Sequence, residues 1–237
     1  MITLEVCVDD AAGLAEAIAG GADRVELCSA LALGGLTPSP GLMALAAHAP
    51  VPCYPMIRPR AGDFVFTAAD VAVMKADIRA ARAAGLPGVV LGGSLPDGRL
   101  DQAVLSDLIA ETGGLDLTLH RAVDLCPDAD EAVETAIALG FNRILSSGGA
   151  RTAAEGLDRL RQMFQTAAGR LIIMPGSGVS PDTLPQLRTL PLTEIHASCA
   201  AALPVGGAPL AFGFQSANDK RTDRTRVAAL KAALKSL

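Results

Sequence analysis

Two stretches near the N-terminus, TLEVCV (3–8) and DRVELCS (23–29), decide the fold class of this 237-residue chain. Both are rich in apolar and branched residues, which is typical of buried strands. A helical pattern lies between them and ends at the glycine pair 20–21, since glycine commonly terminates helices. A strand, a helix and a second strand in this order form a βαβ unit, so we expect the two strands to pair in parallel.

The same alternation continues to the end of the chain. Further strand patterns are CYPMIR (53–58), GVVLG (88–92), LDLTLHRA (115–122), RILSS (143–147), RLIIMPG (170–176) and EIHASC (194–199). Eight such units in about 240 residues predict an α/β fold, a (β/α)8 TIM barrel with a parallel eight-stranded barrel. We expect a single barrel domain over residues 1–237. A doubly wound open sheet is the alternative, but no GxGxxG motif follows the first strand, where a dinucleotide-binding fold would carry it.

Capping residues locate several helix starts. Ser39-Pro40 and Ser180-Pro181 each place a hydroxyl before a proline, which predicts an N-cap followed by the first helical residue. Thr67 with Asp70 three residues later resembles a capping box. The segment RTRVAALKAALKSL (224–237) is predicted to close the chain as a helix.

Composition excludes several classes of function. The net charge is −5, and the basic stretch KRTDRTR (220–226) is interrupted by an aspartate, so we expect no nucleic-acid partner. No run of 18 apolar residues exists, and we expect no membrane span. Five cysteines without a signal-peptide pattern favour reduced thiols in the cytoplasm. The alanine-rich helices favour a homo-oligomer.

Polar residues gather where the strands of the predicted barrel end. Glu5 and Cys7 lie on one face of the first strand, and Glu26 and Cys28 on one face of the second, because side chains alternate along a strand. In a barrel the C-terminal strand ends form the functional mouth. We therefore expect both pairs to project inward, with each thiol nearer the mouth.

Buried carboxylates need cationic or hydrogen-bonding partners, and Arg58, Arg60 and Arg121 are the predicted ones. Met56, His120 and His196 fall on the same rim. Two structural alternatives stand beside a functional site. Cysteines can simply fill layers of a barrel core, and a layer of glutamate and arginine can be purely structural.

The loop MPGSGVSPDTL (174–184) is a second signal. Gly176 and Gly178, on either side of Ser177, allow the backbone to approach a ligand closely. The helix expected from Ser180 would turn its free N–H groups toward the same place, which suits phosphate or another anion. A tight turn would explain the two glycines equally well.

Several stretches together resemble the CutC family, which is named for copper homeostasis. They are LEVCVD, GGADRVELCSAL, GGLTPS, MIRPRAGDF, LHRAVD and the final HAS, and they span nearly the whole chain. The resemblance implies a (β/α)8 barrel in the cytoplasm with copper(I) as the ligand. Val123 stands where the family usually has an aromatic residue, and Ser177 interrupts its glycine-rich turn.

Copper(I) prefers thiolate and thioether donors and accepts imidazole. Under the resemblance, the metal donors on the rim are Cys7, Cys28, Met56, His120 and His196. No CxxC motif or methionine-rich repeat supports them, so the copper hypothesis depends on the family more than on spacing.

An enzyme acting on a small anionic metabolite, possibly phosphorylated, is the second hypothesis. In it the anion is bound by Arg58, Arg60, Arg121, Gly176, Ser177 and Gly178. Glu26, His120 or Glu5 would act as general acid or base, and Cys28 as a nucleophile. Arginines at the mouth favour this hypothesis, because a soft cation gains nothing from positive neighbours. The family favours copper homeostasis, which is the function we predict.

Overall fold

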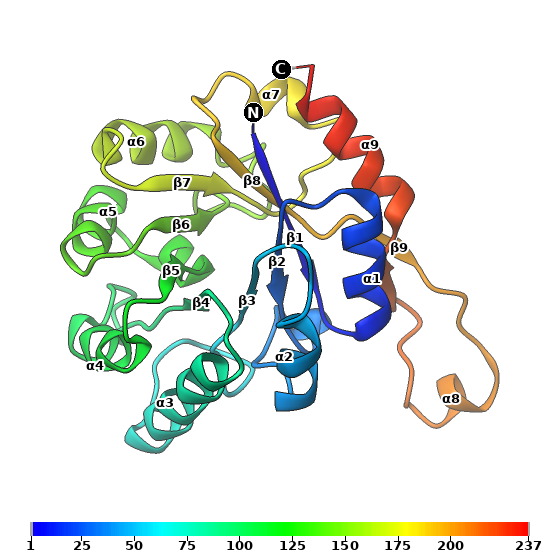
Figure 1. Cartoon of the computed structure of the whole chain (residues 1–237). Helices are drawn as coiled ribbons and strands as arrows, with labels where there is room; N and C mark the ends of the chain where they lie inside the picture. The colour runs from blue at the N-terminus through cyan, green and yellow to red at the C-terminus, as the bar shows by residue number, and fades with distance from the viewer. Residues whose placement is uncertain (1, 237) are drawn as a thin grey trace.

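Eight parallel strands form the centre of the molecule in the computed structural model, which describes residues 2–236 (Figure 1). Each falls within or next to a segment predicted from the sequence, and most are shorter than predicted. Their bounds are β1 Thr3–Val8, β2 Arg24–Leu27, β3 Cys53–Pro55, β4 Gly88–Leu91, β5 Asp116–Leu119, β6 Arg143–Ser146, β7 Ile172–Pro175 and β8 Glu194–Ala197.

The strands follow one another around the barrel in chain order. β3, β2, β1 and β8 form one hydrogen-bonded sheet, and β4, β5, β6 and β7 form another. The two sheets meet at a parallel bridge between Met56 and Val90, and β7 lies beside β8 on the other side. Because β8 pairs in parallel with β1, the first and last strands are neighbours. The predicted (β/α)8 TIM barrel is confirmed.

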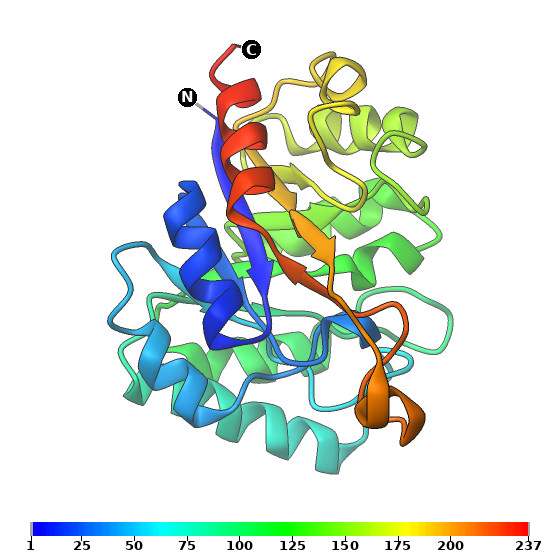
Figure 2. The ribbon, with the colours of Figure 1, turned by 90° about the vertical axis from the view of Figure 1, so that its right-hand side faces the viewer.

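Helices surround the strands (Figures 1 and 2). They are α1 Ala11–Gly20, α2 Pro40–Ala46, α3 Ala68–Ala83, α4 Gln102–Thr112, α5 Ala129–Ala138, α6 Leu157–Ala167, α7 Leu184–Leu187 and α9 Arg224–Leu234, with short 3-10 turns η1 Leu31–Leu33 and η2 Arg121–Leu125. The Ser39 cap before Pro40 is present, and Thr67 and Asp70 form the predicted capping box. The predicted closing helix is α9.

The helix predicted to begin at Ser180 does not begin there. Residues 180–183 form turns, and α7 begins only at Leu184 and lasts four residues. The hydroxyl of Thr183 turns back to the carbonyl oxygens of Gly178 and Ser180. The Ser-Pro pair therefore starts a turn, and within residues 2–236 no long helix begins at Ser180.

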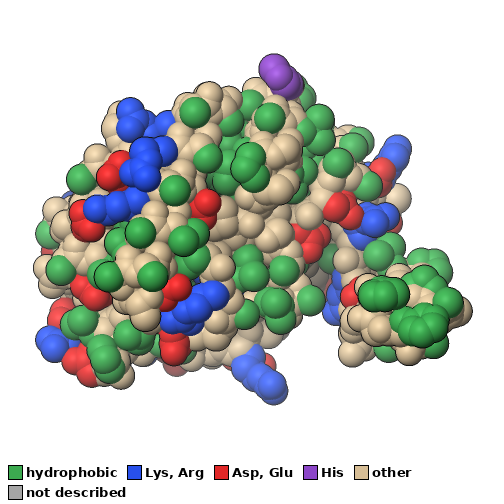
Figure 3. All heavy atoms as spheres, turned by 90° about the horizontal axis from the view of Figure 1, so that it is seen from below, with side chains coloured by type: hydrophobic (Ala, Val, Ile, Leu, Met, Phe, Trp, Pro, Cys, Tyr) green, Lys and Arg blue, Asp and Glu red, His purple; other side chains and the backbone are tan. Residues whose placement is uncertain are grey.

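An additional hairpin, which we call the arm (residues 200–222), follows β8. It consists of β9 Ala200–Ala202, the short helix α8 Gly207–Ala211 and β10 Lys220–Thr222, which pairs antiparallel with β9. The tip stands away from the barrel as a separate lobe (Figures 1 and 3). At its base, the Thr222 hydroxyl donates to the Cys7 carbonyl oxygen at 3.2 Å, so the arm is tied to the end of β1.

One continuous hydrophobic cluster fills the space between strands and helices. It runs from Leu4 in β1 to Leu234 in α9, so the two ends of the chain contribute to the same core. Among residues 2–236, no helix is both long and apolar enough to cross a membrane.

Candidate functional site

Strand register sets the order of the polar side chains inside the barrel. β1 and β8 place Glu5 beside His196, and β1 and β2 place Cys7 beside Glu26. All four residues are buried. Because side chains on one face repeat every two residues, Glu5 lies one layer deeper than Cys7. The expected inward projection of the first Glu-x-Cys stretch is what the structure has.

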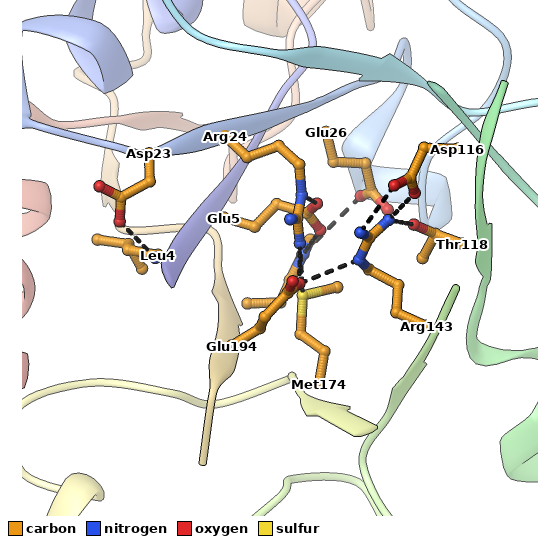
Figure 4. Close-up of polar contacts among 11 residues, drawn as sticks. Leu4, Glu5, Asp23, Arg24, Glu26, Asp116, Thr118, Arg143, Met174 and Glu194 are labelled. Carbon is orange, nitrogen blue, oxygen red and sulfur yellow. Dashed lines mark hydrogen bonds and ion pairs between the residues drawn. The ribbon is translucent and has the colours of Figure 1, made fainter. Parts of the chain in front are cut away.

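Two buried arginines lie on the inner side of this site, away from the mouth. Arg24 forms ion pairs with Glu5 and Glu194. Arg143 pairs with Glu194 at 3.0 Å and with Asp116, and it also donates to the Thr118 hydroxyl at 3.0 Å. Figure 4 shows Glu194 between the two guanidinium groups. The charges of these two arginines are therefore both balanced by carboxylates, as burial requires.

The partners predicted for these carboxylates, Arg58, Arg60 and Arg121, are wrong. Glu5 pairs with Arg24 and His196 instead. A signal for Arg24 was present, because it lies two residues before Glu26 and therefore shares the inward face. Arg143 begins β6, where the alternation was too short to show which face it takes.

Three ligand-type side chains converge next to these charges. One donor atom from each of Cys7, Glu26 and His196 lies within 4.8 Å of the others. His196 Nδ1 is 2.8 Å from Glu5 Oε1, and His196 Nε2 is 3.8 Å from Glu26 Oε2. Glu26 Oε2 also accepts from the Cys28 thiol at 3.6 Å. We call Cys7, Glu26 and His196 the donor trio.

Burial and neighbouring charges shift the pKa values of the site's ionisable groups in different directions. Burial raises the pKa of Glu5, but Arg24 and the hydrogen bond from His196 outweigh it and lower the value to about 2. Burial raises the pKa of Glu26. Burial, followed by the adjacent Glu26, raises the pKa of the Cys28 thiol well above its usual value. For His196, burial lowers the pKa, but Glu26, Cys7 and Glu5 together raise it well above the usual range.

A cavity of about 350 Å³ opens over the donor trio. Its volume is at the lower end of the range for small-molecule sites. Among the residues that line it are the donor trio and Met56, Arg58, Phe64, His120, Arg121, Ser177 and Gly178. The structure thus brings together most of the side chains that the sequence placed at the mouth.

Four candidates do not line the cavity, and one of them is Glu5, which lies one layer deeper. Arg60 does not line the cavity and is bound on the outside by Asp63 at 2.9 Å and Asp70 at 3.3 Å. Gly176 is buried beneath the surface, where a side chain would meet Leu145. Cys28 is fully buried behind Glu26. Neither Gly176 nor Cys28 lines the cavity.

The remaining cations of the mouth differ in their partners. Arg121 pairs with Asp124 at 2.7 Å, so its charge has an opposite partner. Arg58 donates only to carbonyl oxygens, those of Leu33 at 2.9 Å, Gly35 at 3.2 Å and Gly62 at 2.8 Å. Within residues 2–236, three residues that line the cavity each have a buried polar atom without a hydrogen-bond partner: Arg58 Nε, His120 Nε2 and Glu26 Oε1.

Comparison with known proteins gives a consistent result over nearly the whole chain. The model of the CutC family matches residues 2–201. A CutC family protein of Rhizobium meliloti is 57% identical over 235 residues, which cover 98% of this chain and 96% of the relative. The crystal structure of a protein named for copper homeostasis, CutC of Streptococcus agalactiae, superposes with a TM-score of 0.79 at 30% identity, covering 84% of this chain and 99% of that one.

More distant barrels share the fold alone. Thiamine phosphate pyrophosphorylase of Pyrococcus furiosus matches with a TM-score of 0.60 at 14% identity, over 99% of this chain and 96% of that one. The family model ends at residue 201, so most of the arm and all of α9 lie beyond it.

Proposed function

The chain belongs to the CutC family, and from this premise we propose that it is a copper homeostasis protein that binds copper(I) at the mouth of its barrel. The observation that supports the proposal is the convergence of Cys7, Glu26 and His196 within 4.8 Å. A thiolate and an imidazole are donors that copper(I) accepts. The structural relative from Streptococcus agalactiae carries a name that refers to copper homeostasis.

The hydrogen bonds around His196 favour its role as a ligand. Because Glu5 has a low pKa, its carboxylate accepts the Nδ1 proton at 2.8 Å. A histidine that donates one ring nitrogen to a carboxylate is oriented to offer the other nitrogen to a metal. Nε2 is the nitrogen on the side of Glu26, inside the donor trio. Against the effect of burial, Glu26, Cys7 and Glu5 raise the pKa of His196, so copper(I) binding there would displace the proton on Nε2. Met56 lines the same cavity and adds a thioether.

His120 is not part of the proposed ligand set. Its Nδ1 accepts the backbone N–H of Ala122 at 3.2 Å, so the neutral ring carries its proton on Nε2. Coordination of a metal at Nε2 would require this proton to move to Nδ1, which would break the hydrogen bond from Ala122. We assign His120 the role of a hydrogen-bond donor instead.

The cytoplasm is the proposed location. All five cysteines are free thiols, and a thiol site for copper(I) requires a reducing compartment.

The test is an anaerobic titration of the reduced protein with copper(I) against a competing chelator of known affinity. We expect one tight equivalent in the native protein and a loss of about 100-fold or more in affinity for Cys7→Ser and His196→Gln, since each removes a ligand. Cys28→Ser should lose less, because its thiol contacts Glu26 rather than the cavity.

Cys126→Ser is the matched control. Cys126 is also buried, but it packs beside η2 and does not line the cavity. Its affinity for copper(I) should equal that of the native protein. Equal affinities for the Cys7, His196 and Cys126 variants would overturn the proposed site.

A second candidate function, an enzyme acting on a small anionic metabolite, is favoured by a different observation. Arg58 is 5% exposed, lines the cavity and has no carboxylate partner within residues 2–236. A buried cation without a counter-ion is costly, so an anion from outside would complete the site. Screening of the native protein against small anions by calorimetry tests this function, and the absence of any bound anion would contradict it.

A further inference from the structure

We propose that the barrel mouth binds a small organic carboxylate whose oxygens accept hydrogen bonds from Arg58 Nε and His120 Nε2. This inference rests on the second candidate function and narrows its ligand to one chemical class. It uses side chains that are not in the donor trio, so it is tested on metal-free protein.

Arg58 carries a buried positive charge that no carboxylate of residues 2–236 neutralises. The two other buried arginines of the barrel interior are neutralised by carboxylates of the chain, Arg24 by Glu5 and Arg143 by Asp116. Within residues 2–236, the hydrogen bonds of the Arg58 guanidinium go to carbonyl oxygens only. Carbonyl groups satisfy N–H donors but leave the positive charge unpaired, and one negative charge on a ligand would balance it.

The Arg58 guanidinium keeps an N–H donor that no group of the described chain uses. The terminal nitrogens Nη1 and Nη2 of Arg58 are engaged by the loops around Gly35 and Gly62. These contacts fix the guanidinium plane and leave Nε without a partner in the described chain. Three of the five guanidinium N–H groups are thus used, and the N–H of Nε is available to a ligand oxygen.

His120 supplies the other donor. Burial, and then the charge of Arg58, lower the pKa of His120 to about 3, so the ring is neutral at physiological pH. With Nδ1 occupied by the Ala122 N–H, the proton is on Nε2, which also lacks a partner in the described chain. Both side chains pack on Phe64, whose ring lies 4.8 Å from the His120 ring and 4.9 Å from Arg58 Cζ.

Phosphate is a poorer match to these groups. Sites for phosphate use several backbone N–H groups or several cations. Arg60 is bound outside the cavity by Asp63 and Asp70. The Gly176 N–H donates to the Ser146 carbonyl oxygen at 2.9 Å, and α7 is only four residues long. One unpaired positive charge, together with the N–H groups of Arg58 Nε and His120 Nε2, fits a monoanionic carboxylate.

The experiment is isothermal calorimetry on reduced, metal-free protein with three probes: lactate, its uncharged analogue lactamide, and inorganic phosphate. We expect lactate to bind at one equivalent and to bind at least about tenfold more tightly than either other probe, because a hydrogen bond to a charged group contributes more than a neutral one. Arg58→Lys and His120→Asn should each weaken lactate binding by about tenfold or more.

Arg60→Gln is the matched control, because this arginine is close in sequence but outside the cavity, and it should leave lactate binding unchanged. His120→Asn keeps the result interpretable if Arg58→Lys fails to fold, since an asparagine oxygen can still accept the Ala122 N–H. Lactate binding that both cavity variants retain would overturn the proposal.

The probes also separate this proposal from the function on which it rests. Phosphate that binds more tightly than lactate, and only when Arg58 is present, would overturn the carboxylate class and keep the anionic-metabolite function. No binding of either anion would overturn both.

Discussion

Glu5 connects the structural and the functional parts of the barrel interior. One of its oxygens pairs with Arg24 and the other is 2.8 Å from His196 Nδ1. Its side chain is fully buried, so both contacts act in a medium where charge interactions are weakly screened. The same carboxylate therefore neutralises the layer of arginines and orients a proposed metal ligand.

We expect Glu5→Gln to destabilise the metal-free protein by about 3–5 kcal/mol at pH 7, the usual cost of breaking a buried ion pair. The pKa of Glu5 falls from 4.5 to about 2 on folding. A carboxylate with a lowered pKa stabilises the fold above its unfolded value, and this contribution disappears as the pH falls toward the folded value. The difference between the native protein and the variant should stay constant from pH 7 to about 5 and shrink below about 4.5.

Urea unfolding across this pH range measures the effect. Glu134→Gln is the control, because Glu134 pairs with Arg170 on the surface, where both side chains are about half exposed. Exposed pairs contribute at most about 1 kcal/mol. A Glu5 variant as stable as the Glu134 variant would show that the buried pair does not support the fold.

At the level of single residues, the sequence predicted which side chains belong to the site better than it predicted which of them contact one another. Alternation along β1 and β2 was enough to place Cys7 and Glu26 at the mouth, because the period of a strand is fixed by its geometry. It could not identify Arg24 as the partner of Glu5, since that contact depends on the register between two strands. Strand register is a tertiary property, and the pattern of one segment does not contain it.

At the level of elements, the strands were predictable and the connections were less so. Each strand shows apolar residues in a run or in alternation with polar ones, whereas the arm contains apolar residues that remain exposed. Phe212 and Phe214 are 75% and 86% exposed, and their rings lie 6.2 Å apart. Figure 3 shows hydrophobic side chains on this lobe. Composition alone gives no sign that these residues lie outside the core.

We expect chymotrypsin to cut first at Phe212 or Phe214, because an exposed segment with few packing contacts reaches a protease without unfolding of the barrel. The two fragments should remain together. The C-terminal fragment contains α9, which packs on α1 and is held by Arg224–Glu16 at 2.6 Å. Mass spectrometry identifies the cut, and size-exclusion chromatography shows whether the fragments separate.

A Phe212→Ser/Phe214→Ser double variant is the control and should resist the enzyme for longer. The other aromatic chymotryptic sites are all buried or half-buried: Tyr54, Phe64, Phe66, Phe141 and Phe164. Initial cleavage within the barrel would contradict the arm as the most accessible element.

At the level of the whole molecule, the two ends of the chain close the barrel together. β1 pairs with β8, and α1 packs against α9, as the neighbouring positions of the termini in Figure 1 also show. Gly20 is the point of closest approach between these helices, because a side chain there would meet Val227 and the Arg224 carbonyl oxygen at 2.8 Å. This contact joins residues about two hundred positions apart, so the alternating strand and helix patterns predict it only through the closed fold.

Gly20→Ala should therefore destabilise the protein by about 1–3 kcal/mol, the usual cost of overpacking a tight contact, although alanine favours helices. Gly41→Ala is the matched control, since Gly41 is also helical but a side chain there would meet only Ser39 Oγ at 3.9 Å. That change should stabilise the protein by about 0.5–1 kcal/mol. Thermal unfolding measures the effect of both changes. In a Val227→Ala background, where the contact is smaller, Gly20→Ala should cost less stability than in the native protein. If both glycine variants were stabilised, the α1–α9 contact would not be the tight closure of the barrel that the structure describes.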